Sequence, residues 1–334
     1  MNKNNFKSRE YGFTLIELLI AMAITGIVSA VIFTAFHSQH KSYLVQEDVA
    51  VMQQNLRAGM DMMVREIRMA GCDPTGNANA QIERAEPDLI YFTMDVTGGG
   101  ADGIDNDGDD LIDGDDLIDE DDLIDEDDKE DEKKYSDGDE DEKKYSDGDT
   151  GDSNEHIAFD LYDSNGINVL GRTTSKKAIT ITEDPSGHFE SDNPPPNHQP
   201  LAENIEALGF AYAYDTDNDG SLETSPNGHI IWAVDSDGDN DLDINLDTDD
   251  DGDIDAADGP GAGNNGIVGG TAIADVEVND IRAVRIWMLA KAGRRDNKYL
   301  NTSTYVVGRK IITPNDKLRR RLLTTTVKCR NLGL

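Results

Sequence analysis

The stretch that decides how this chain is built is "GFTLIELLIAMAITGIVSAVIFTAF", residues 12–36. As a helix at 1.5 Å per residue, residues 13–36 would extend about 36 Å, which is enough to cross a bilayer. The short leader before them is basic, which places it on the cytoplasmic side. A plain signal anchor explains the length and the charge. It does not explain Glu17, because a carboxylate inside a membrane span costs roughly 2.5–3.5 kcal/mol.

The first part of this stretch, "GFTLIELLIAM", resembles the class III leader-and-helix motif of type IV pilins and type II secretion pseudopilins. The resemblance implies that a prepilin peptidase removes residues 1–12 by cutting after Gly12. It also implies that the new N-terminus, Phe13, is N-methylated, and that Glu17 is the glutamate typical of the fifth mature position. The amine on Phe13 would lie one helical turn from Glu17, at the positive end of the helix dipole.

Glu17 therefore has a physical role as a charge partner. An isolated charge in a membrane is unfavourable, whereas a paired one is tolerated and can specify register. We hypothesise that Glu17 is a docking charge. It would neutralise its own amine, or that of a neighbouring subunit, when the chain enters a filament.

The helix is expected to continue beyond the membrane, from about residue 14 to residue 70. Residues 13–36 are apolar all round, whereas residues 37–72 carry a single apolar stripe that suits burial against a head domain. Gly71 and Pro74 supply a stop. The stripe consists of Val45, Val49, Met52, Leu56, Met60, Met63 and Ile67.

The rest of the chain, residues 73–334, has short β-like segments and is predicted to form a β-rich head. The sequence contains no Gly-rich phosphate loop, HExxH or GxSxG motif, so an enzyme is not expected. Strands are predicted at 88–96, 156–163, 177–183, 208–215, 229–235, 282–292, 303–313 and 320–331.

Four blocks resemble PilW-type minor pilins, which are relatives of the J-type minor pseudopilin. The resemblance implies an α+β, type IV pilin-like fold, with a long N-terminal helix packed on an antiparallel sheet. It also implies a role in pilus initiation and assembly, followed by display on the fibre. The implied partners are other pilins, the prepilin peptidase and an inner-membrane assembly platform. The blocks are "REIRMAGCDP" (65–74), "LAENIEALGFAYAYDTDNDG" (201–220), "IRAVRIWMLAKAG" (281–293) and "RRRLLTTTVKCRN" (319–331).

The net charge of −38 is concentrated in two segments. Residues 102–149 contribute −21 and residues 235–258 contribute −12. Such segments repel nucleic acid and attract cations, so no nucleic-acid partner is expected. The basic segment "KLRRRLL", 317–323, is predicted to be a solvated or subunit-facing strand. Residues 102–154 contain short repeats and few large apolar residues, and we expect a flexible acidic insertion there.

The segment "DTDDDGDIDAAD", 247–258, has the ligand spacing of a calcium loop, because alternate carboxylates converge as such a loop coils. Gly252 occupies position 6 and Ile254 is the apolar anchor at position 8. Asp at position 12 replaces the usual Glu, which predicts weaker closure. The candidate ligands are Asp247, Asp249, Asp251, Asp253, Asp255 and Asp258.

Three further segments repeat this pattern in part, without the flanking helices of an EF-hand. Segment 215–223 has Pro226 at position 12, and segment 235–243 has Asn240 where glycine is usual. We predict isolated, weak Ca²⁺ sites; the alternative is solvated charge alone. Their candidate ligands are Asp215, Asp217, Asp219 and Glu223; Asp235, Asp237, Asp239 and Asp243; and Asp105, Asp107, Asp109 and Asp113.

Two cysteines, Cys72 and Cys329, could form one bridge in an oxidising compartment. The family pattern does not include either, and their joint presence favours a disulfide; the alternative is two separate buried thiols. Three other functions stay open at this point. They are a J-like minor pseudopilin of a type II secretion system, a pilus-associated calcium-dependent adhesin, and a membrane-anchored calcium sensor without a filament.

Overall fold

The computed structural model describes residues 13–74, 76–96, 150, 155–174, 198–259 and 266–333. Two compact units make up the chain, residues 1–50 and residues 51–334. Several sequence predictions lie outside the described residues. These are the leader with Gly12, most of the acidic insertion with Asp105, Asp107, Asp109 and Asp113, and the strand expected at 177–183.

Helix α1 spans Leu15–Ile67, close to the predicted helix from 14 to 70. In the first unit, every residue from 13 to 43 is exposed, including all the large apolar side chains. The helix is long and apolar enough to cross a membrane, and its most apolar stretch has a mean hydropathy of 2.5. No part of the described chain covers this apolar surface.

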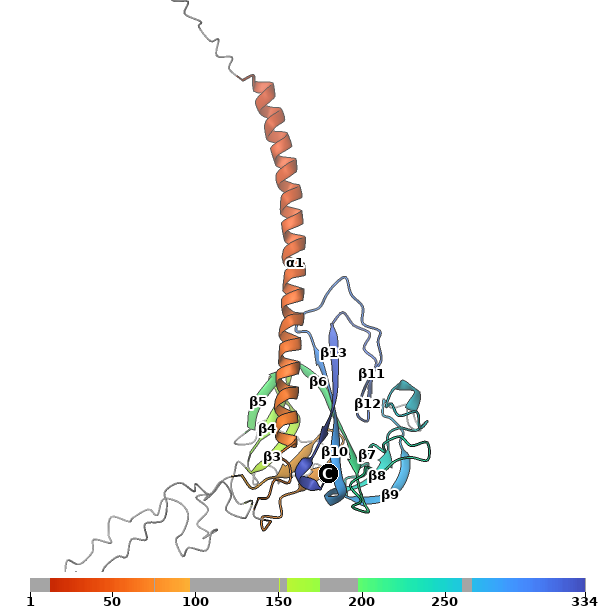
Figure 1. Cartoon of the computed structure of the whole chain (residues 1–334). Helices are drawn as coiled ribbons and strands as arrows, with labels where there is room; N and C mark the ends of the chain where they lie inside the picture. Colours follow the sequence, from red (N-terminus) through yellow and green to blue (C-terminus); the bar gives the residue numbers. More distant parts are fainter. Residues whose placement is uncertain are drawn as a thin grey trace, which may run out of the picture. The chain divides into compact units, whose positions relative to one another are not determined.

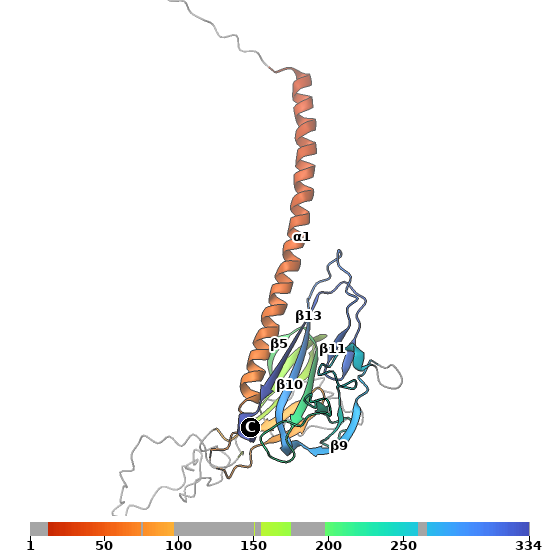
Figure 2. The same cartoon turned by 45° about the vertical axis from the view of Figure 1, so that its right-hand side comes forward.

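The second unit contains the sheets, whose pairings are all antiparallel (Figures 1 and 2). The five-stranded sheet has the order β1 (Ile82–Ala85), β2 (Ile90–Thr93), β3 (His156–Ser164), β4 (Ile167–Thr173) and β5 (His198–Glu203). The six-stranded sheet has the order β13 (Arg320–Lys328), β10 (Ile281–Lys291), β6 (Ile205–Tyr214), β7 (Ala233–Val234), β8 (Asp241–Asn245) and β9 (Thr271–Glu277). A separate hairpin pairs β11 (Tyr305–Val307) with β12 (Lys310–Ile312), and 3-10 turns lie at η1 (Ala256–Asp258), η2 (Val278–Asp280) and η3 (Arg330–Leu332).

The C-terminal part of α1 packs on both large sheets. Its predicted stripe is confirmed where it enters the second unit, because Met52, Leu56, Met60, Met63 and Ile67 are buried. At Gly59, an added Cβ would lie 2.9 Å from Leu170 on β4, 3.2 Å from Ala202 on β5 and 3.5 Å from Met288 on β10. Glycine therefore allows the helix backbone to approach both sheets at once.

The two sheets are also tied to each other directly. The hydroxyl of Tyr212, on the central strand β6, donates to the carbonyl oxygens of Glu86 (2.9 Å) and Leu89 (3.1 Å), next to β2. A second apolar core lies beneath the acidic loops and contains Trp232, Ile254 and Trp287. The α+β architecture predicted from the sequence, a long N-terminal helix packed on antiparallel β-structure, is confirmed.

Several strand predictions need correction. The strand expected at 229–235 is reduced to Ala233–Val234, because residues 225–229 form a tight turn. Segment 303–313 is a hairpin rather than one strand. Segment 235–258 was expected to be calcium-loop sequence without a strand, but Asp241–Asn245 within it form strand β8. Strands β1, β4, β5 and β9 were not predicted.

Candidate functional site

The N-terminus of α1 carries a capping box built by Thr14 and Glu17. The carboxylate oxygen Oε2 of Glu17 accepts from the backbone N–H of Thr14 and from its hydroxyl, both at 2.9 Å. The Thr14 hydroxyl oxygen accepts from the Glu17 N–H at 3.3 Å. The Thr-x-x-Glu spacing, readable in the sequence, predicts this arrangement, although we interpreted Glu17 only as a partner for the Phe13 amine.

The capping box places the Glu17 carboxylate against the first turn of the helix, in contact with Thr14, which directly follows Phe13. Phe13 itself is 92% exposed, so its backbone is accessible. The Glu17 carboxylate is therefore held at the N-terminal end of the helix by Thr14, the residue that follows Phe13.

Three acidic loops in the head share one backbone conformation: loop 215–223, loop 235–243 and loop 247–258. Position 4 is left-handed in each, at Asn218 (φ 56°), Gly238 (φ 87°) and Asp250 (φ 56°). Position 6 is left-handed too, at Gly220 (86°), Asn240 (74°) and Gly252 (93°). Asn240 therefore takes the conformation that glycine takes in the other two loops, as Asn tolerates it.

The first carboxylate of each loop is buried and organises the backbone around it. Asp247 accepts from the N–H groups of Asp251 (3.2 Å) and Gly252 (2.9 Å). The equivalent N–H groups of Asp219 (3.2 Å) and Gly220 (2.9 Å) donate to Asp215. In loop 235–243 the corresponding carboxylate accepts from the N–H groups at positions 3, 4 and 6. The hydrogen bonds turn each loop back on itself, so that alternate carboxylates converge.

A second carboxylate closes each loop by accepting from the Ser or Thr at position 2. Glu223 accepts from Thr216, and Asp243 accepts from Ser236. In loop 247–258 the closing residue is Asp258, at position 12, whose Oδ1 accepts from the Thr248 N–H at 2.6 Å. Loop 247–258 is therefore closed by Asp258, the residue that was predicted as its ligand at position 12.

The apolar residue at position 8 anchors each loop to the protein interior. Leu242 is fully buried, and Ile254 is 6% exposed in the core around the two tryptophans. Leu222 is partly buried against the same core. Each loop is thus fixed at its first carboxylate and at position 8, while the carboxylates at positions 3 and 5 face outward.

The structure brings together only part of the predicted ligand set. Three carboxylate groups have their oxygens within 4.8 Å of one another: Asp215, Asp217 and Asp219; Asp235, Asp237 and Asp239; and Asp247, Asp249 and Asp258. The remaining predicted ligands of loop 247–258 are not in its group. The side chain of Asp253 approaches Arg285 (3.9 Å), and Asp255 accepts from the Ala257 N–H as the cap of η1.

Electrostatics within these groups favour a bound cation. Loss of hydration and the charges of Asp251, Asp258 and Asp247 raise the pKa of Asp249. Although Asp217 accepts from the Asp219 N–H, the charge of Asp219 helps to raise its pKa, and the pKa of Asp237 is raised in the same way by Asp239. A divalent cation would remove this repulsion, and clustered oxygen donors are what Ca²⁺ prefers.

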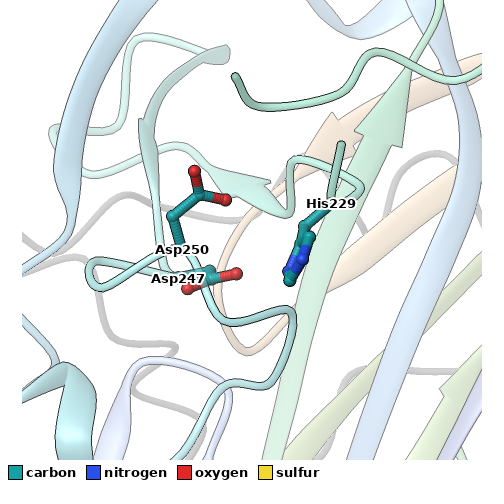
Figure 3. Close-up of side chains that lie close together, drawn as sticks. All are labelled: His229, Asp247 and Asp250. Carbon is teal, nitrogen blue, oxygen red and sulfur yellow. The ribbon is translucent and has the colours of Figure 1, made fainter. Parts of the chain in front are cut away.

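Sequence reasoning missed one residue near loop 247–258. His229 joins Asp247 and Asp250, with one potential ligand atom from each within 4.8 Å of the others (Figure 3). A lone histidine in a turn gives no signal in the sequence, because only the fold brings it beside this loop.

The two cysteines are free thiols in the structure. The segments that carry them are in contact: the Asn331 side chain donates to the Met69 carbonyl oxygen at 3.4 Å, and an added Cβ on Gly71 would lie 2.0 Å from Leu332. Burial raises the pKa of Cys329 to about 12, and burial with the charges of Asp95 and Asp73 raises the pKa of Cys72. The predicted bridge is not formed here, and it stays a prediction.

Two of the four basic residues of segment 317–323, Arg319 and Arg320, form ion pairs within the chain. Arg320, whose side chain is 3% exposed, pairs with Glu206 and Asp316, and these carboxylates raise its pKa. Arg319 pairs with Asp296 at 2.7 Å. The strand is therefore less available to a partner than its sequence indicates.

Comparisons with known proteins agree with the sequence resemblance. The prokaryotic N-terminal methylation motif matches residues 7–33, and the family model of the type IV pilus-assembly protein W matches residues 232–331. A comparison with curated proteins gives no match. Among solved structures, a type IV-like pilin from Thermus thermophilus is 11% identical, with a TM-score of 0.35 over 84% of this chain and 98% of that one.

A TM-score of that size supports no inference about this chain. The family matches do, because they fall on both ends of the chain. The second of them contains two acidic loops together with strands β10 and β13. The leader motif and the assembly-protein match together support the resemblance to PilW-type minor pilins with a class III leader.

Proposed function

We propose that this chain helps to initiate and assemble a type IV pilus and is then displayed on the fibre, with a head stabilised by calcium. The observation that carries the proposal is the exposed apolar first half of α1, beneath a class III leader. A surface of this kind is compatible with lipid before assembly and with other pilin helices afterwards. Its role is structural rather than catalytic.

The processing steps follow from the leader. A prepilin peptidase cleaves after Gly12 and methylates the amine of Phe13, while the head lies in the periplasm. Glu17 then pairs with an amine during docking on the inner-membrane assembly platform. The match to the pilus-assembly protein W supports a pilus in preference to a secretion pseudopilin.

The calcium part of the proposal rests on the three acidic loops. Their shared backbone, the buried first carboxylate and the outward carboxylates at positions 3 and 5 support three Ca²⁺ sites. The ligands are Asp215, Asp217 and Asp219; Asp235, Asp237 and Asp239; and Asp247, Asp249 and Asp258. Bound Ca²⁺ would supply charge neutralisation that the loops lack by themselves.

The test is recovery of the chain from fibres. A piliated host that lacks this chain is complemented with it, and filaments are sheared from the cells. We expect the sheared fraction to contain the chain with methylated Phe13 as its first residue, as read by mass spectrometry. Uncleaved chain confined to the membrane fraction of fully piliated cells would refute the proposal. A Gly12→Ala chain is the matched control, and it should stay unprocessed.

A further inference from the structure

The group formed by His229, Asp247 and Asp250 joins two segments of the head. His229 lies on a tight turn, in which the Ser225 N–H donates to the His229 carbonyl oxygen at 2.7 Å and the His229 N–H donates to Ser225 Oγ at 3.2 Å. The two aspartates belong to loop 247–258. Figure 3 shows the imidazole and the two carboxylates facing a common space.

Two atoms of this group are buried without a hydrogen-bond partner, His229 Nδ1 and Asp250 Oδ1. A buried polar atom left in this state is destabilising, so a bound cation at this position would be favourable. The ligand atoms of the group lie within 4.8 Å of one another, and no ion pair between His229 and either aspartate occurs in the described part of the chain. Two ligands of one zinc-like ion, at about 2.0–2.2 Å each, lie within roughly 4.4 Å of each other. The group is close to that spacing.

The surrounding backbone holds the group in place. The left-handed conformation of Asp250 (φ 56°) is fixed by the coiling of loop 247–258. An added Cβ on Gly252 would lie 2.6 Å from His229 Nδ1, so the imidazole rests directly against this loop. The Asn227 side chain donates to the Asp250 carbonyl oxygen at 3.5 Å. These contacts therefore hold His229 on the 225–229 turn and the two aspartates on loop 247–258 in place.

We propose that His229, Asp247 and Asp250 bind a divalent transition metal of the Zn²⁺ type, which cross-links the 225–229 turn to loop 247–258. Imidazole nitrogen suits zinc-like ions, whereas Ca²⁺ takes oxygen ligands. The proposed site and the calcium ligand set of loop 247–258 share only Asp247, whose two carboxylate oxygens can bridge two cations.

Loop 215–223 supplies an internal contrast for this site. Its fourth residue is Asn218, with the same φ of 56° as Asp250, and the Asn218 Oδ1 accepts from Arg282 at 2.8 Å. At position 4, loop 215–223 therefore has an asparagine that accepts from an arginine, whereas loop 247–258 has an aspartate that lies beside a histidine. Asp250→Asn is therefore a conservative change, because the chain already places Asn in this conformation.

The experiment titrates Co²⁺ and then Zn²⁺ into the full chain in detergent, with Ca²⁺ at a saturating level. All variants carry His37→Gln and His40→Gln, because these two exposed histidines on α1 could bind metal themselves. We expect one equivalent of Co²⁺ with visible d–d absorption, displaced by Zn²⁺. His229→Gln and Asp250→Asn should each weaken binding about tenfold or more. Asp275→Asn should leave Zn²⁺ binding intact, because Asp275 is an exposed aspartate outside the acidic loops.

Equal Zn²⁺ affinity in the parent, His229→Gln and Asp250→Asn chains would overturn the proposal, as would the absence of Zn²⁺ binding in the folded parent. Far-UV circular dichroism checks that each variant is folded. The outcome is independent of the calcium proposal, which is measured by the response of the same chains to Ca²⁺ alone.

Discussion

The two halves of helix α1 have one backbone conformation and opposite environments. Up to residue 50 the helix exposes apolar side chains, whereas beyond it one stripe is buried against two sheets. Met22 is 65% exposed and Met63 is fully buried, although both are methionines on the same helix. The comparison teaches that contacts within this chain specify the second half, whereas no contact within the described chain covers the apolar surface of the first half.

The largest expected effect concerns Glu17, the one carboxylate among residues 13–36. Glu17→Leu removes the partner of the Phe13 amine, so we expect loss of the chain from sheared filaments while membrane insertion persists. The head should melt at the same temperature as in the parent. Immunoblots of membrane and sheared fractions measure the first effect.

Thr14→Val separates docking from helix capping at this position. It removes the hydroxyl that donates to Glu17, which should cost about 0.5–2 kcal/mol of helix stability but leave assembly largely intact. Filament incorporation that is equally lost in Thr14→Val and Glu17→Leu would mean that Glu17 acts only as a cap. Normal incorporation of Glu17→Leu would refute the docking role.

The second prediction compares Met63, in the buried half of the helix, with Met22, in the exposed half. Met63→Ala leaves a cavity between α1 and the sheets, so the free energy of unfolding of the head should fall by about 2–5 kcal/mol. Met22→Ala, the matched control, should leave it unchanged. Denaturant titration of the full chain in detergent, followed by the fluorescence of the two buried tryptophans, measures both. Similar losses in the two variants would contradict the division of the helix.

The same division explains what could be predicted from the sequence. The helix was predictable nearly to its ends, since residues 13–36 are apolar throughout and a single apolar stripe then continues as far as Ile67. Strands β6 and β10 were predictable because they are buried on both faces. Strand β8 was not, because its apolar residues Leu242 and Ile244 alternate with aspartates that read as loop. Its pairing with β7 and β9 makes it a strand.

The candidate site, too, could be predicted from the sequence only in part. The alternation of aspartates predicted where carboxylates converge, since that spacing is local to each loop. It overestimated the ligand set, because Asp253 and Asp255 interact with Arg285 and with η1 instead. His229 depends on a long-range contact, and nothing in the residues around it indicates a ligand.

The third prediction concerns the end of the buried half, where Cys72 follows the helix. In the oxidising compartment we expect a bridge to Cys329, worth about 2–4 kcal/mol. Extracellular protein, denatured without reductant, should then show no reactive thiol, and reductant should lower the unfolding midpoint. Two thiols labelled after denaturation would refute the bridge. The raised pKa of both thiols means that simple lack of labelling in the folded protein is not sufficient evidence.

The last prediction concerns calcium, which should act on the head and leave the apolar half of the helix unaffected. Removing Ca²⁺ leaves the outward carboxylates of the three loops unneutralised. At Ca²⁺ a hundredfold above Kd, binding stabilises by about 2.7 kcal/mol per site, so the full chain in detergent should melt markedly lower in chelator. Magnesium should substitute poorly, because it requires a tighter octahedral shell.

Single substitutions test which carboxylates cause the calcium-dependent rise in melting temperature. Asp249→Asn is better suited than a change at Asp247, because the buried Asp247 also holds the loop backbone through Asp251 and Gly252. Asp249→Asn and Asp217→Asn should each remove part of the calcium-dependent shift in melting temperature. Asp275→Asn, an exposed aspartate outside the loops, is the matched control and should remove none. Equal melting temperatures in chelator, calcium and magnesium at fixed ionic strength would show that the loops are solvated charge. The head would then owe its stability to the core alone, as the buried half of the helix does.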